Sequence, residues 1–112
     1  MGSRSTYLSP PDLRRLDWAC RPITAAFGRP PYLVGSALTR PDYRDIDVRL
    51  ILDDEVFDQL VLNDEVHLLL NIALGDFVAK SANLPAPVDF QIQSRTEANV
   101  PEHGGRNPLG MR

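Results

Sequence analysis

Cysteine is almost absent from this chain of 112 residues, since Cys20 is its single representative. One cysteine forms neither an intramolecular disulfide framework nor a zinc cluster of several thiolates. Cys20 lies at helical spacing from Leu16, Ile23 and Phe27, which favours a small buried side chain over a reactive thiol. The composition therefore excludes a domain held together by disulfides or by a thiolate metal cluster.

Long apolar runs are missing as well. No stretch approaches the roughly 20 apolar residues that a membrane-spanning helix needs. The first residues, MGSRSTYLSPPD, lack the apolar segment of a secretory signal. We therefore expect a cytoplasmic protein with no membrane partner, in which residues 1–8 are flexible.

Lysine is scarce, because Lys80 stands beside eleven arginines. The net charge of −3 provides no overall basic field that would attract nucleic acid or an anionic membrane. Arginine suits bidentate recognition of phosphate, but a GC-rich coding sequence is the favoured explanation of the skew. The charge composition therefore leaves binding to nucleic acid open.

Three helices follow from capping residues and apolar periodicity. Ser9 before Pro10 predicts the start of a helix that ends at Gly28, and Pro22 is expected to kink or split it. A short helix follows Asp53, and a longer one follows Asn63 and ends at Asn83. The longer helix carries a wide apolar stripe and is expected to be a core helix, packed closely at Gly75; the stripe comprises Val66, Leu69, Leu70, Ala73, Leu74, Phe77 and Val78.

Strands are predicted at Tyr32–Val34, at residues 45–52 and at Val88–Gln93, each from its apolar content or its alternation. Together with the helices they predict an α+β (mixed α/β) fold, a small mixed β-sheet flanked by helices, in one domain over residues 1–93. Residues 94–112 are rich in Gly and Pro and are expected to form a C-terminal tail. His103, Arg106 and Arg112 could contact a phosphate or a partner there, although a solvated tail is the favoured interpretation.

The second predicted strand carries an unusual pair of acids. Its alternation places Asp45, Asp47 and Arg49 on one face and apolar residues on the other. Two carboxylates on one strand face repel each other, and a divalent cation between them would relieve the repulsion. Asp89 adds a third acid to the polar face of the last strand. This pattern predicts a metal site.

Gly35 and Ser36 directly follow the first strand. A glycine there lets the backbone approach a ligand closely, and the amides that follow can face a phosphate. Together with Asp45, Asp47 and Asp89, the order of these motifs resembles the nucleotidyltransferase fold of the DNA polymerase beta-like superfamily, in particular its minimal members. The resemblance covers roughly residues 22–93.

The resemblance implies a chemistry and a set of ligands. Asp45, Asp47 and Asp89 would be the catalytic carboxylates that hold Mg²⁺ or Mn²⁺, with Gly35 and Ser36 against the phosphates of a nucleoside triphosphate. The enzyme would transfer a nucleoside monophosphate to a hydroxyl of a protein, an RNA end or a small molecule.

The segment between Ser36 and the first acid departs from the family. It carries Leu38, Pro41 and Tyr43 where small members often have a Gly/Arg-rich loop. Arg44 stands where these members often have a small polar residue, and it could contact the triphosphate or pair with a carboxylate. A second hypothesis is therefore a catalytically inactive relative that acts as a binding or assembly module. It could be of the antitoxin type with a separately encoded helical protein as partner, or be encoded by a phage or mobile element.

Overall fold

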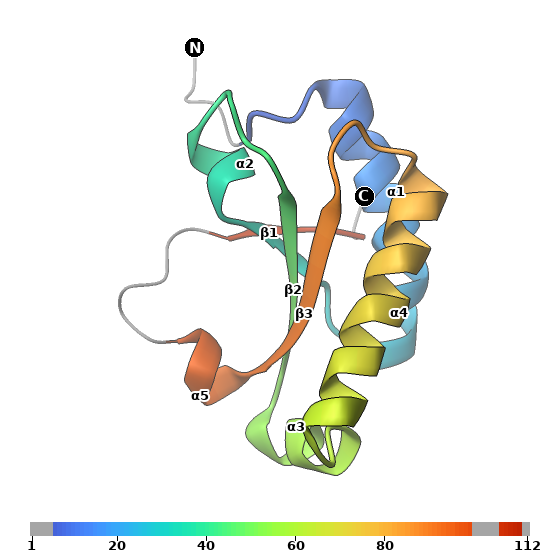
Figure 1. Ribbon diagram of the computed structural model, residues 1–112, viewed down its shortest axis with the longest axis vertical. Helices are drawn as coiled ribbons and strands as arrows, with labels where there is room; N and C mark the ends of the chain where they lie inside the picture. The colour runs from blue at the N-terminus through green and yellow to red at the C-terminus, as the bar shows by residue number, and fades with distance from the viewer. Residues whose placement is uncertain (1–5, 100–105, 111–112) are drawn as a thin grey trace.

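The computed structural model describes residues 6–99 and 106–110 and shows the mixed α+β fold that the sequence predicts (Figure 1). Within these residues, the strands form one sheet in the order β3-β2-β1-β4. β2 and β3 are parallel, whereas β1 is antiparallel to both of its neighbours. The strands are β1 (Tyr32–Val34), β2 (Ile46–Leu52), β3 (Val88–Ser94) and β4 (Asn107–Pro108).

The two long helices, α1 (Pro10–Phe27) and α4 (Asp64–Ala82), cover one face of this sheet (Figure 1). The short helices α2 (Ser36–Thr39) and α5 (Arg95–Ala98) lie toward opposite ends of the other face. Among the described residues, no helix crosses the middle of that second face. We call it the open face. The remaining helix, α3 (Asp54–Leu60), connects β2 to α4.

The caps of α1 are those that the sequence predicts. The Ser9 side chain accepts a hydrogen bond from the Asp12 amide, and Gly28 ends the helix with φ +69°. The helix continues through Pro22, so the expected split does not occur. Pro22 is exposed, and water can therefore hydrate the carbonyl group that loses its helical partner.

The core lies between the sheet and the long helices. Along β2 and β3 the alternation sends one set of apolar side chains to this side, and these side chains are between 0 and 3 % exposed. Cys20 belongs to the same core, as the sequence predicts, and its burial raises the pKa of the thiol to about 12. A thiol with so high a pKa is protonated at neutral pH and is a poor nucleophile. The strand residues concerned are Ile46, Val48, Leu50, Phe90 and Ile92.

Helix α4 differs from the expected core helix. Gly75 packs closely on β3, as predicted, because an added Cβ would lie 3.2 Å from the Cβ of Phe90. However, Leu69 is 66 % exposed and Phe77 is 40 % exposed, so the prediction that the whole stripe is buried is wrong. The buried side of the helix comprises Gly75, Val78 and Ala82, and Leu70 and Leu74 are partly buried against the core. No helix among the described residues is both long and apolar enough to cross a bilayer.

The start of the chain is more ordered than the sequence suggests. The Thr6 hydroxyl and the Tyr7 amide both donate hydrogen bonds to the carbonyl of Ala37, and Leu8 is buried. The predicted flexible segment is therefore wrong for residues 6–8. Residues 1–5 lie outside the described part of the chain.

The predicted C-terminal tail is also wrong for the residues that the structure describes. After β3 the chain forms α5, and β4 then pairs with β1 at the edge of the sheet. Leu109 is fully buried, and the amide of Gly110 donates to the buried carboxylate of Asp17 at 2.8 Å. Residues 100–105 and 111–112, with the candidates His103 and Arg112, lie outside the described residues.

Candidate functional site

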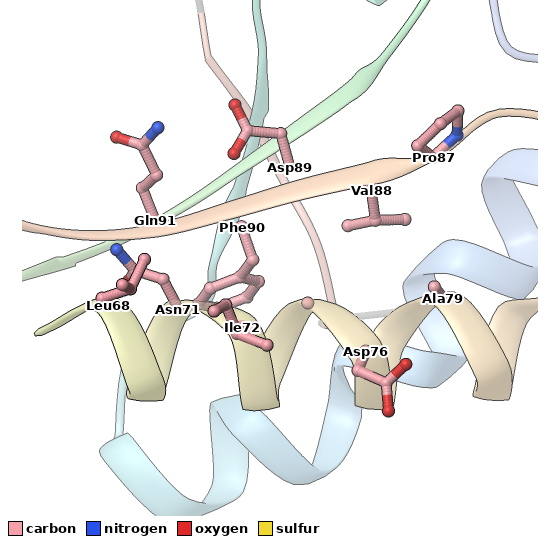
Figure 2. A pocket seen from close by; sticks show the side chains of 11 residues that line it. Leu68, Asn71, Ile72, Asp76, Ala79, Pro87, Val88, Asp89, Phe90 and Gln91 are labelled. Carbon is pink, nitrogen blue, oxygen red and sulfur yellow. The ribbon is translucent and has the colours of Figure 1, made fainter. Parts of the chain in front are cut away.

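The register of the sheet brings two of the predicted acids together. Asp47 on β2 is paired with Asp89 on β3, and residues paired in this way point to the same face of a sheet. Figure 2 shows that Asp89 and Gln91 point away from α4, whereas Val88 and Phe90 point toward it. Asp47 and Asp89 therefore share the open face.

Arg49 contacts both of these acids. Its Nη2 lies 3.4 Å from Oδ2 of Asp89 and 3.7 Å from Oδ1 of Asp47. Its Nη1 donates to the backbone carbonyl of Asp89 at 2.8 Å. The Arg49 side chain is only 14 % exposed, so the guanidinium group is a partly buried counter-charge fixed between two strands. Arg49 was not predicted as a site residue, although the alternation along the strand places it on the same face as Asp47.

The carboxyl group of Asp47 is the electrostatic centre of this cluster. Partial burial raises its pKa, the charge of Arg49 lowers it, and the neighbouring Asp89 and Asp45 raise it again. The net result is a pKa above the ordinary aspartate value. The folded protein thus disfavours the ionised form of Asp47, chiefly because the carboxyl group is partly buried.

Because the pKa of Asp47 is raised, the electrostatics of the cluster can be tested through the pH dependence of protein stability. The folded state binds a proton at Asp47 more tightly than the unfolded state does, so stability falls as the pH rises through the interval between the two pKa values. We therefore expect Asp47→Asn to be more stable than the wild type at pH 7 in EDTA. Its advantage should shrink as the pH falls through the carboxyl range. Thermal melts at a series of pH values measure the difference, with Asp58→Asn as control.

A lower Tm for Asp47→Asn at pH 7 would show that the ion pair with Arg49 outweighs the cost of burial and like charge. Asp58 is an exposed acid of α3 and lies outside the cluster. Its replacement should leave the pH dependence of Tm close to that of the wild type.

Gly35 approaches the same carboxylate. It adopts φ +76° and ψ −150°, a backbone conformation that is essentially restricted to glycine. A Cβ at Gly35 would lie only 2.3 Å from Oδ2 of Asp47. The close approach that the structure shows is to the side chain of Asp47, and the approach to a phosphate stays a prediction.

A cavity of about 160 Å³ joins this turn to the acids. It is lined by Ser36 and Arg44, by Asp45 and Asp47, and by the loop residues Arg40, Asp42 and Tyr43. Asp45 is exposed and lies one residue before β2 begins, not on the strand as predicted. Asp89 lies beside Asp47 and is absent from the lining of this cavity.

The acids lie farther apart than the ligands of a complete metal site. Within residues 6–99 and 106–110, no three acids, histidines or cysteines are arranged closely enough to hold a metal ion. Asp47 is the common neighbour, with Asp89 on one side and Asp45 on the other. The carboxylate oxygens match the donors that Mg²⁺ prefers, and the cation that contacts two of them in this structure is Arg49.

A groove of about 480 Å³ lies between α4 and β3 (Figure 2). Asp89 and Gln91 belong to its lining, so it reaches the acids from the free edge of the sheet. Near the far end of β3, the Asn71 side chain accepts from the Ile92 amide, and Nε2 of His67 lies 2.7 Å from the Ile92 carbonyl oxygen. His67 thus holds α4 against the strand edge.

Comparison with known proteins yields no relative: no protein-family model matches, and neither curated proteins nor solved structures give a match. The resemblance to the nucleotidyltransferase fold therefore depends on the sequence motifs alone.

Proposed function

We propose that this protein is a metal-dependent nucleotidyltransferase that moves a nucleoside monophosphate from a nucleoside triphosphate to a hydroxyl acceptor. The observation that carries the proposal is the pairing of Asp47 with Asp89 beside the Gly35 turn. Arg49 offsets part of the repulsion between these acids, yet the pKa of Asp47 is still raised, so a bound cation would stabilise the cluster further. The expected compartment is the cytoplasm.

Each residue has a role in this proposal. Asp45, Asp47 and Asp89 would hold Mg²⁺ or Mn²⁺, which would neutralise charge on the phosphates. The backbone at Gly35 and Ser36 would contact the triphosphate, and Arg44 in the same cavity would add a positive charge. The acceptor oxygen attacks the α-phosphorus, the bond to the bridging oxygen breaks and pyrophosphate leaves. Asp89 takes the proton of the attacking hydroxyl.

The metal is tested by its effect on stability. A cation that binds only the folded state stabilises it by RT ln(1 + [L]/Kd), about 1.4 kcal/mol at ten times Kd. We expect Mg²⁺ or Mn²⁺ to raise the Tm of the wild type by several degrees. Asp45→Asn combined with Asp47→Asn should remove that gain and leave the fold intact, because neither side chain belongs to the core.

The matched control replaces two exposed acids of α3, Glu55→Gln with Asp58→Asn. It lowers the negative charge of the protein by the same amount away from the site. A control that loses the metal response, or a site variant that keeps it, would contradict the assignment of the metal to Asp45 and Asp47.

A second candidate function is a catalytically inactive binding or assembly module. The observation in its favour is Arg49, which already supplies a positive charge to Asp47 and Asp89. An antitoxin-type member would co-purify with a small helical protein encoded by a neighbouring gene. For a module that binds no nucleotide, Tm should be unchanged by Mg²⁺ and each of the triphosphates.

A further inference from the structure

A second cavity, of about 170 Å³, lies at the other end of the open face and is rich in arginine. Three guanidinium groups line it, from Arg29 before β1, Arg95 at the start of α5 and Arg106 before β4. These residues are far apart in the sequence, so the fold brings their side chains together. The other residues of the lining are Pro30, Tyr32, Ile51 and Asn99.

The positive charge of this cavity is only partly compensated. Oδ1 of Asp53 accepts from Nη2 of Arg29 at 2.7 Å and lies 3.0 Å from Nη2 of Arg95. The guanidinium group of Arg106 donates to Oδ1 of Asn99 at 2.8 Å and lies 5.9 Å from the ring centre of Tyr32. Asp54 also lies close enough to Arg95 for their charges to attract each other. Among the described side chains, three positive charges thus face two negative charges, and the cavity keeps a net positive charge.

We propose that this cavity binds a phosphate group carried by a nucleotide or by the end of a nucleic acid strand. Guanidinium groups present paired N–H donors that match phosphate oxygens, and an anion would relieve the repulsion among the arginines. The ring of Tyr32 offers an aromatic surface beside the cavity on which a base can stack. Asn99 adds an amide to the same wall.

The position of the cavity relates it to the acids. Ile51 lines the arginine cavity and Asp47 lines the acidic one, and both belong to β2. Four residues along a strand span about 13 Å and return to the same face. A ligand whose phosphate lies among the arginines therefore lies on the open face, within reach of Asp47. The inference stands on the arginine cavity alone and does not require nucleotidyl transfer.

Calorimetric titration at low salt tests the proposal, with EDTA present so that metal bound to the acids plays no part. The probes are inorganic phosphate, a nucleoside monophosphate and a short single-stranded oligonucleotide with a 5′-phosphate or a 5′-hydroxyl. We expect the phosphorylated oligonucleotide to bind at least tenfold more tightly than its hydroxyl form. Tight binding of the monophosphate alone would identify a free nucleotide as the source of the phosphate, and tighter binding of the oligonucleotide would identify a nucleic acid end.

Variants of the arginines test whether phosphate binds in this cavity. Arg95→Gln and Arg106→Gln should each weaken phosphate binding at least fivefold, whereas Arg15→Gln on α1 should leave it unchanged. Arg95 and Arg106 are exposed, so their replacement spares the core. A melting curve for each variant checks that it is folded.

The Asp53→Asn variant distinguishes a phosphate-binding site from a group of arginines that only stabilises the fold. Its side chain makes no capping hydrogen bond to α3, so its removal frees Arg29 and Arg95 without loss of a cap. We expect tighter phosphate binding and a larger gain in Tm on addition of phosphate. Measurable but equal binding of the two oligonucleotides, no binding of any probe, or weaker phosphate binding by folded Asp53→Asn would overturn the proposal.

Discussion

Asp89→Asn is expected to abolish nucleotidyl transfer while triphosphate binding stays nearly intact. Asp89 is paired with Asp47 but does not line the cavity at Ser36, and in the proposed mechanism it acts mainly on the attacking hydroxyl. Loss of a general base lowers the rate by roughly 10²–10⁴-fold. The measurement is transfer of radiolabel from each triphosphate, with Mg²⁺ or Mn²⁺, to products in a lysate. Binding of a fluorescent triphosphate is measured in parallel.

The matched control is Asp76→Asn, the same substitution at an exposed acid of α4 whose partner is Lys80. It lies on the other side of β3 from Asp89, as Figure 2 shows. The control should transfer label at the wild-type rate. Full activity of Asp89→Asn would contradict the catalytic role, and a wild type that labels no product with any triphosphate would favour the inactive module.

Gly35→Ala should have the largest effect on the site as a whole. The backbone conformation at Gly35 costs other residues about 1–3 kcal/mol, and the new methyl group would collide with Oδ2 of Asp47. The Asp47 side chain must then shift from the position in which it contacts Arg49. We expect a Tm lower by several degrees, together with triphosphate binding at least tenfold weaker. Gly35→Val should be more severe, and Ser36→Ala milder because its backbone amide is kept.

Gly28→Ala is a control that measures the cost of a positive φ without a collision between the new methyl group and a neighbouring side chain. Gly28 also has a positive φ, +69°, but nothing lies within 4 Å of an added Cβ. Its substitution should cost about 1–2 kcal/mol and leave triphosphate affinity unchanged. Normal triphosphate binding by Gly35→Val would show that the turn does not contact the phosphates.

Much of the fold could be predicted because local signals and tertiary structure agree. Capping residues define α1 and α4 to the residue, and alternation along β2 and β3 identifies their buried faces. The same alternation placed Asp47 and Asp89 on polar strand faces. That the two strands are neighbours, and in which register, is a long-range property that no local pattern contains.

The incorrect predictions, for α4 and for the C-terminal residues, arose where the sequence carries no clear local pattern. α4 is apolar around most of its circumference, so periodicity could not decide which side contacts the sheet, and Leu69 and Phe77 proved exposed. β4 has only two residues and therefore no alternation to detect. Arg106, assigned to a solvated tail, lines the arginine cavity only because β4 pairs with β1.

The pairing of β4 with β1 also bears on how the chain folds during synthesis. The hydrogen bond from Gly110 to Asp17 joins residues 93 positions apart, and Leu109 belongs to the same core as Leu16 and Leu33. Until these residues leave the ribosome, the outer edge of β1 lacks its partner and the core is incomplete. Contacts of such long range slow folding, and an unpaired strand edge can pair wrongly with other chains. The edge of β1 thus stays open to wrong pairing until the residues up to Gly110 have left the ribosome.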